Sequence, residues 1–177
     1  MIVRIPHKKV TAMMANNTYL KGMLGQRSTF RYLVRSIALH PIFKTLPLKL
    51  SKYLARHVTK QSFSEKSMIF NLQDTVSGIH IIIAGKACYL AENNAGKKFT
   101  LLPLQSNSLA GDLLLQGTGA TLGHELFAVT KVYTLFMPLE PLLNISAAFP
   151  PLIHRLTQYA EQQQQQIALS LSELKHD

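Results

Sequence analysis

The chain has 177 residues, 47% of them apolar, and a formal net charge of +10. That length suffices for one domain with a real core and one appended element, and two full domains are not expected. Its single cysteine cannot form an internal disulfide, and no apolar run approaches the roughly 18 residues of a membrane span. We therefore expect a soluble, cytoplasmic protein with no membrane span.

The charge is divided unevenly along the chain. Residues 1–60 contain 12 Lys and Arg and no Asp or Glu, whereas residues 61–177 contain 7 basic and 9 acidic residues. A cationic segment attracts polyanions, such as nucleic acid or an anionic membrane surface, through long-range fields and counterion release. The alternative interpretation is an ordinary solvated surface.

The N-terminal segment changes character near residue 26. Residues 1–25 are weakly patterned, and Gly22 and Gly25 are expected to interrupt any long helix there. Residues 27–39 predict an amphipathic helix, with arginines recurring at i, i+4 and i+8 beside an apolar face. These arginines are Arg27, Arg31 and Arg35. The apolar face is expected to cover the core of the domain. The alternatives are that the arginines dock nucleic acid or another polyanion, or that the segment is a targeting presequence.

The next segments change from helical to extended character. Residues 46–58 have the apolar spacing of a helix, and residues 62–72 contain extended segments before turn residues at 71–78. Residues 125–137 are rich in Val, Thr, Phe and Tyr, which predicts late strands, and residues 139–143 fit a short turn.

Residues 77–116 hold the clearest pattern of the chain. Isoleucines at alternate positions of 79–83 predict a strand, Gly85 allows a bend, and residues 88–90 continue extended. Asn93 to Gly96 predicts a hairpin turn, after which residues 97–104 return as the partner strand. A polar corner then leads to Gly111-Asp112 and an apolar run.

This order of elements resembles the cyclic-nucleotide-binding β-roll superfamily, which includes the catabolite activator and fumarate-nitrate regulator (Crp/Fnr) transcription factors. The resemblance covers roughly residues 43–175 and rests mainly on Gly85, Gly96 and Gly111. It implies a mainly β fold with flanking helices (α+β). The expected architecture is an antiparallel double-stranded β-helix or jelly-roll barrel, with N-terminal helices and a long C-terminal helix.

Three parts are expected on this basis. Residues 1–40 form the basic N-terminal segment with its amphipathic helix, residues 41–147 the cyclic-nucleotide-binding-like β-roll, and residues 148–177 the C-terminal helix. The regulators of this family carry a winged helix-turn-helix after that helix, whereas this chain ends at Asp177. We expect either a sensor module without a DNA-reading part or a docking function moved to the basic N-terminal helix.

The last helix is expected to open at Pro150-Pro151, because proline is tolerated at a helix start. Its seam residues, at spacings of three and four, are Leu152, Leu156, Tyr159, Gln163, Ile167, Leu171 and Leu174. The resemblance implies that two chains form a homodimer through this helix. The alternative is that the seam packs on the barrel of its own chain.

The family also implies where a ligand would bind. In members that bind a cyclic nucleotide, a Gly-Glu pair holds the ribose hydroxyl, and an arginine followed by a small residue clamps the phosphate. Here Gly111-Asp112 replaces Gly-Glu, and the arginine position falls near residues 122–124. The ligand-pocket candidates are therefore Gly111, Asp112, Leu122, Gly123 and His124.

The clamping arginine is missing. Residues 57–154 contain no arginine, and burying a phosphate without a charged partner costs several kcal/mol. Standard binding of cAMP or cGMP is therefore not expected. His124 could donate to an anion when protonated, with Lys131 nearby in sequence, but both also fit ordinary surface or strand positions. Asp112 likewise fits an ordinary turn residue.

Other chemistries lack the residues that they need. Residues 117–123 imitate a dinucleotide fingerprint, but a strand-like segment follows instead of a long helix. Cys88 alone cannot hold an iron–sulfur cluster and fits a small core residue. His80 and His124 each lack the second histidine of a metal site. We expect no enzyme activity, cofactor or metal.

Two functions remain as hypotheses. The first is a sensor or regulatory domain resembling Crp/Fnr-type transcriptional regulators, with an altered effector pocket. The second is a non-enzymatic interaction protein whose basic N-terminal helix docks nucleic acid or another polyanion.

Overall fold

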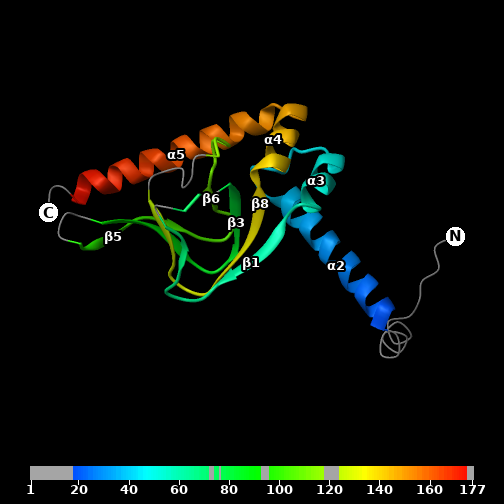
Figure 1. The fold of residues 1–177 in the computed structure, drawn as a ribbon. Helices are drawn as coiled ribbons and strands as arrows, with labels where there is room; N and C mark the ends of the chain where they lie inside the picture. Colours follow the sequence, from blue (N-terminus) through cyan, green and yellow to red (C-terminus); the bar gives the residue numbers. More distant parts are fainter. Residues whose placement is uncertain (1–17, 72–73, 76, 93–95, 118–123, 175–177) are drawn as a thin grey trace.

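Two antiparallel sheets and four helices make up the described part of the chain (Figure 1). The computed structural model describes residues 18–71, 74–75, 77–92, 96–117 and 124–174. The helices are α2 (Thr18–Leu39), α3 (Leu48–Ala55), α4 (Leu139–Ala148) and α5 (Pro151–Leu174). The strands are β1 (Thr59–Phe63), β2 (Met68–Phe70), β3 (Gly78–Ala84), β4 (Ala87–Glu92), β5 (Lys98–Leu104), β6 (Leu109–Gly111), β7 (Glu125–Ala128) and β8 (Val132–Pro138).

The strands pair in two sheets of four. Sheet 1 has the order β1-β8-β3-β6 and sheet 2 the order β2-β7-β4-β5, and every pair is antiparallel. This confirms the predicted α+β roll with N-terminal helices and a long C-terminal helix. Within the described residues no strand pairing joins the two sheets, so a barrel closed by hydrogen bonds is not detected there. β1 and β2 are edge strands of different sheets, so the roll is open between them.

Alternation along β3 divides the interior into two cores. Ile79 and Ile81 face the helices, where they pack with side chains of α2, α3, α4 and α5. Ile82 faces sheet 2 and packs with side chains such as Tyr89 and Leu126. The period of two in a strand produces this division, because successive side chains point to opposite faces.

The predicted hairpin of residues 88–104 is confirmed. β4 pairs with β5 from Ala87 opposite Leu104 to Glu92 opposite Lys98. Most of the turn that joins the two strands lies outside the described residues. The extended segment 125–137 is also confirmed and contains β7 and β8.

Two helices differ from their predictions. α2 begins at Thr18 and passes through Gly22 and Gly25. The expected interruption is therefore wrong, because a single glycine costs a helix only about 1 kcal/mol. The short turn expected at 139–143 is wrong as well. It is the first half of α4, which buries Leu142 and Ile145 at the helical spacing of three.

The helices cover one face of sheet 1 (Figure 1). Leu33 and Ile37 of α2 are buried in this core, which confirms that the apolar face of the basic helix covers the roll. The described helices include none that is both long and apolar enough to cross a membrane.

Candidate functional site

The Gly-Asp turn lies directly after β6, where the family places its ligand. Gly111 has a φ of 109°, a backbone conformation that favours glycine. The Asp112 side chain is fully buried. The backbone N–H of Asp112 donates to the carbonyl of Gly78 at 2.8 Å. Its Oδ1 accepts the backbone N–H of Gln116 at 3.0 Å, and its Oδ2 accepts that of Gly117. Asp112 therefore anchors the loop that follows it.

This arrangement limits what Asp112 can offer to a ligand. A carboxylate bonded to a ribose hydroxyl must present an oxygen to the binding cavity. Here each oxygen accepts an amide of its own loop, and the residue has no exposed surface. The geometry is that of a turn residue whose carboxylate oxygens accept local N–H donors.

Tyr89 fills the space behind the turn. It lies on β4 with 1% of its surface exposed, and its Oη accepts the backbone N–H of Gly111 at 3.4 Å. Burial raises the pKa of the Tyr89 phenol well above its usual value. No motif in the sequence singled out Tyr89. Its position at an inward-facing point of the predicted strand was the available signal, but its contact with Gly111 depends on the pairing of the sheets.

The predicted anion-binding positions show no free cation in the described residues. Leu122 and Gly123 lie outside the described residues. His124 is half-buried, and burial lowers the pKa of its imidazole, which favours the neutral form. The Nζ of Lys131 lies 5.2 Å from the ring centroid of Tyr133, which is on the exposed face of β8.

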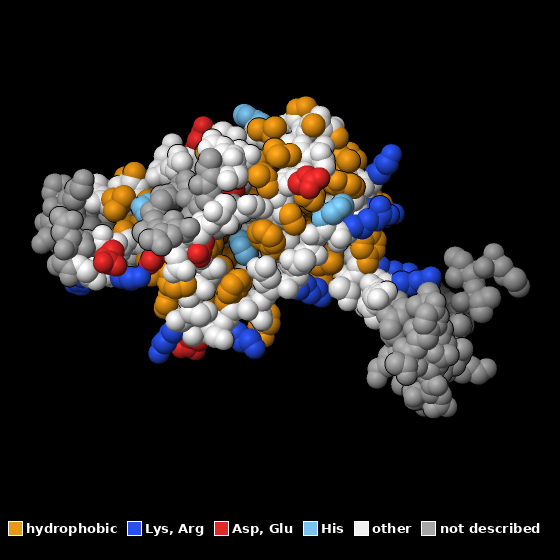
Figure 2. Space-filling view, viewed as in Figure 1, with side chains coloured by type: hydrophobic (Ala, Val, Ile, Leu, Met, Phe, Trp, Pro, Cys, Tyr) orange, Lys and Arg blue, Asp and Glu red, His pale blue; other side chains and the backbone are white. Residues whose placement is uncertain are grey.

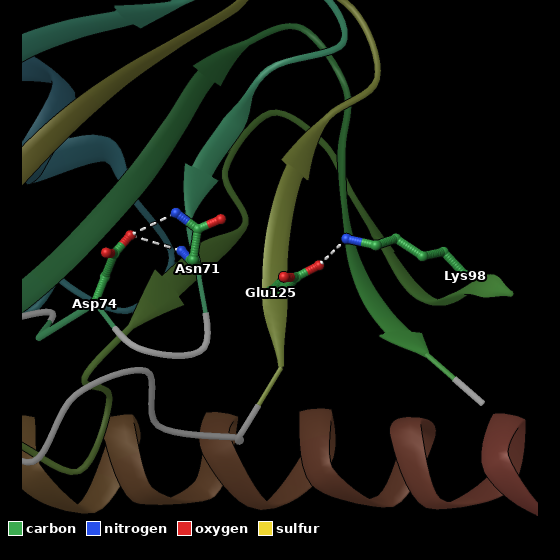
Figure 3. Close-up of polar contacts among 4 residues, drawn as sticks. All are labelled: Asn71, Asp74, Lys98 and Glu125. Carbon is green, nitrogen blue, oxygen red and sulfur yellow. Dashed lines mark hydrogen bonds and ion pairs between the residues drawn. The ribbon is translucent and has the colours of Figure 1, made fainter. Parts of the chain in front are cut away.

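One ion pair crosses sheet 2 next to His124 (Figure 3). Lys98 Nζ on β5 lies 2.5 Å from Glu125 Oε2 at the start of β7. The hydrogen bond to Glu125 raises the pKa of Lys98, so the ammonium stays charged. This cation is already compensated by a carboxylate and does not replace the missing arginine.

Helix α5 holds β6 through a pair of side chains. Gln163 Nε2 donates to the carbonyl of Leu109 at 2.9 Å, and Tyr159 Oη accepts the Leu109 N–H at 3.0 Å. β6 is an edge strand of sheet 1, so these contacts satisfy backbone groups that no strand pairs. The Gly-Asp turn is thereby tied to α5.

The seam of α5 faces its own roll. Exposure is 1% for Leu152, 1% for Leu156, 4% for Gln163 and 4% for Ile167. These four side chains pack on the chain's own roll, and the assignment of the seam to a dimer contact stays a prediction. Tyr159 and Leu171 are half-buried, and the Leu174 side chain lies outside the described residues. The outward face includes the exposed Gln162 and residues 164–166, also glutamines.

The arginine stripe lies apart from the turn. Arg27, Arg31 and Arg35 are exposed on α2, which extends away from the roll in Figure 1. Figure 2 shows Lys and Arg side chains gathered where α2 leaves the body of the molecule. Docking of a polyanion there stays a prediction.

Other candidate chemistry meets local obstacles. Cys88 is buried, and burial raises the pKa of its thiol, which disfavours the reactive thiolate. Within the described ranges, no three His, Cys, Asp or Glu side chains gather as a metal site would require.

Comparisons with known proteins identify the fold. Neither a protein-family model nor a curated protein sequence matches the chain. Among solved structures, the regulatory subunit of a cAMP-independent protein kinase A from Trypanosoma brucei matches with a TM-score of 0.66 and 16% identity, covering 83% of this chain and 52% of that chain. The Thermus thermophilus catabolite activator protein matches with a TM-score of 0.62 and 20% identity, covering 76% and 63%. A Trypanosoma cruzi kinase regulatory subunit, cAMP-independent and bound to guanosine, gives 0.64 and 14%, covering 82% and 50%.

The chain has a cyclic-nucleotide-binding-like β-roll, which confirms the resemblance seen in the sequence at the level of the fold. It spans between half and two thirds of the length of these structures.

Proposed function

We propose that the chain is a regulatory sensor domain of the cyclic-nucleotide-binding type that does not bind cAMP or cGMP in the standard way. The observation that carries this proposal is the buried carboxylate of Asp112, whose two oxygens accept the amides of Gln116 and Gly117. The group that should meet a ribose hydroxyl is engaged within the chain.

Electrostatics support the same conclusion. A cyclic phosphate loses its water when it enters a roll and needs a guanidinium fork or an equivalent set of donors in exchange. Residues 57–154 supply no arginine. Lys98, the cation at the start of β5, is paired with Glu125. A phosphate near Asp112 would also meet a carboxylate of like charge.

Two of the similar solved structures support a regulatory role for this fold that does not depend on cAMP. Both trypanosome kinase subunits are described as cAMP-independent, and one of them is bound to guanosine, which has no phosphate. A triple mutant of the T. brucei subunit, in which one substitution introduces an arginine, is described as bound to cAMP. In that protein, a variant with one added arginine thus binds the nucleotide.

Isothermal titration calorimetry of the wild-type chain with cAMP and with cGMP tests the proposal. We expect no binding in the micromolar range, and a clear micromolar isotherm would contradict the proposal. The informative variant restores the family's groups: Tyr89→Val to open space, Asp112→Glu and Leu122→Arg.

This triple variant should bind cAMP measurably, while Asp112→Glu alone should stay silent because it supplies no cation. A triple variant that folds but does not bind would show that something other than these three groups excludes the nucleotide.

A further inference from the structure

A hollow lies at the open edge of the roll, away from the Gly-Asp turn. It has a volume of about 490 Å³ and takes its lining from β1, β2, β3 and β8 and from Asp74, Thr75 and Ser77. Its lining includes the side chains of Phe63, Ile69, Phe70, Asp74, His80 and Phe136. Because β1 and β2 are the edge strands where the two sheets do not pair, the hollow occupies the open side of the roll.

Aromatic rings surround one imidazole in this hollow. The ring of His80 lies with its centroid 4.8 Å from that of Phe136, 6.1 Å from that of Phe63 and 6.3 Å from that of Phe70. The rings meet at inclined angles of 36° to 65°, not as a closed parallel stack. Aromatic surfaces favour a planar aromatic guest, and the half-buried Phe63 and Phe136 rings keep surface for such a contact.

His80 is the polar group of the hollow. It is 6% exposed, and its Nδ1 lies 3.3 Å from Thr134 Oγ1 on β8. The other ring nitrogen, Nε2, has no hydrogen-bond partner among the described residues. Desolvation lowers the pKa of His80 to about 4, so the ring is neutral at physiological pH. A neutral imidazole can exchange one hydrogen bond with a ligand without requiring an opposite charge.

The charge of the lining argues against an anionic ligand. Among the described residues that line the hollow, Asp74 is the one that carries a formal charge. It is exposed, and its Oδ2 accepts the backbone N–H of Asn71 at 2.7 Å and the side-chain amide at 3.1 Å (Figure 3). An anion would meet a carboxylate at the rim and no cation within, so an uncharged ligand fits better.

The hollow is separate from the family's ligand position. Gly111 and Asp112 do not line it, and Tyr89 stands between the two regions. The ring centroids of Phe70 and Tyr89 are 6.3 Å apart, so one aromatic layer joins the lining of the hollow to the side chain that fills the Gly-Asp region.

We propose that this hollow binds an uncharged, planar heteroaromatic molecule of nucleoside size or smaller, held among Phe63, Phe70 and Phe136 with one polar edge at His80. The volume of about 490 Å³ lies within the range of small-molecule sites. This inference rests on the proposed sensor function and names the class of ligand that the sensor would take.

The test titrates indole and adenosine into the full chain and follows backbone amides by two-dimensional NMR. We expect saturable shifts at Phe63, Phe70, His80 and Phe136, with a Kd on the order of 1 mM or tighter for these small probes. His80→Phe keeps an aromatic ring but removes the hydrogen bond, and it should weaken adenosine binding roughly five-fold.

A blocking variant provides the control for position. Ser62 is exposed and lines the hollow, so Ser62→Trp should occupy it without disturbing the core and should weaken both probes at least ten-fold. The matched control is Ser172→Trp, an exposed serine near the end of α5, which should bind both probes as the wild type does. Thermal melts confirm that both variants fold.

Three results would overturn the inference: no saturable shift with either probe, equal binding by Ser62→Trp, or shifts centred on Gly111 and Asp112. Silent probes together with silent cyclic nucleotides overturn this inference alone. Binding of cAMP together with probe shifts at His80 overturns the proposed function alone.

Discussion

The Gly-Asp turn behind Tyr89 and the hollow around His80 lie in the same roll, yet their side chains are arranged in opposite ways. At the turn, the Gly111 amide meets the Tyr89 hydroxyl and Asp112 accepts two amides of its own loop. At the hollow, His80 lies beside about 490 Å³ of open space. A change of side-chain volume at one inward position can thus fill one region of a roll while another stays open. The backbone need not change, because strand pairing uses main-chain groups.

The largest effect is expected from removing the side chain that fills the first region. Tyr89→Ala should lower the free energy of unfolding by about 3–5 kcal/mol, because it removes a fully buried ring and leaves a cavity. Tyr133→Ala, at a tyrosine 45% exposed on β8, should cost less than about 1 kcal/mol. Urea denaturation of both variants measures the difference. Equal losses would mean that Tyr89 is not the packed ring described above.

The next largest effect is on the pH dependence of stability, through His80 in the hollow. The folded-state pKa of His80 is about 4, below its unfolded value of 6.5, so the unfolded chain takes up the proton first. The neutral His80 ring therefore contributes fully to the free energy of unfolding above pH 6.5. That contribution, about 3 kcal/mol, is lost as the pH falls toward 4.

His80→Phe should flatten the dependence of stability on pH between 6.5 and 4, as measured by urea denaturation across that range. Part of the slope should remain in this variant, because burial also lowers the pKa of His40 and His124. An unchanged slope in His80→Phe would contradict the buried, neutral imidazole.

The smallest effect is expected from helix α5, which contacts β6 next to the Gly-Asp turn. Gln163→Ala removes the donor to the Leu109 carbonyl and should cost about 1–2 kcal/mol. Hydrogen exchange should speed up at Gly111 and Asp112, just after Leu109, and much less at Phe63, which lines the hollow on β1 and pairs with β8. The exposed neighbour Gln164 provides the control, since Gln164→Ala should change neither. Equal acceleration at Phe63 would show that α5 supports both regions alike.

Local patterns in the sequence predicted much of the fold. Alternating isoleucines at 79–83 and the Asn/Gly turn after residue 92 identified β3 and the β4–β5 hairpin, since period and turn chemistry act over a few residues. The helix boundaries were predicted less well. α2 passes through Gly22 and Gly25 because tertiary packing of Leu33 and Ile37 outweighs the weak propensity of two glycines.

The amino-acid order by itself determined the main strands and the absence of an arginine from residues 57–154, because both follow from composition and short-range spacing. The class of fold was implied by the resemblance to the β-roll superfamily. The tertiary structure alone decided which side chains meet. Tyr89 reaches Gly111, Phe63 and Phe136 converge on His80, and the α5 seam turns toward its own roll. These contacts join residues far apart along the chain. They depend on the register and order of the strands, which a local pattern does not encode.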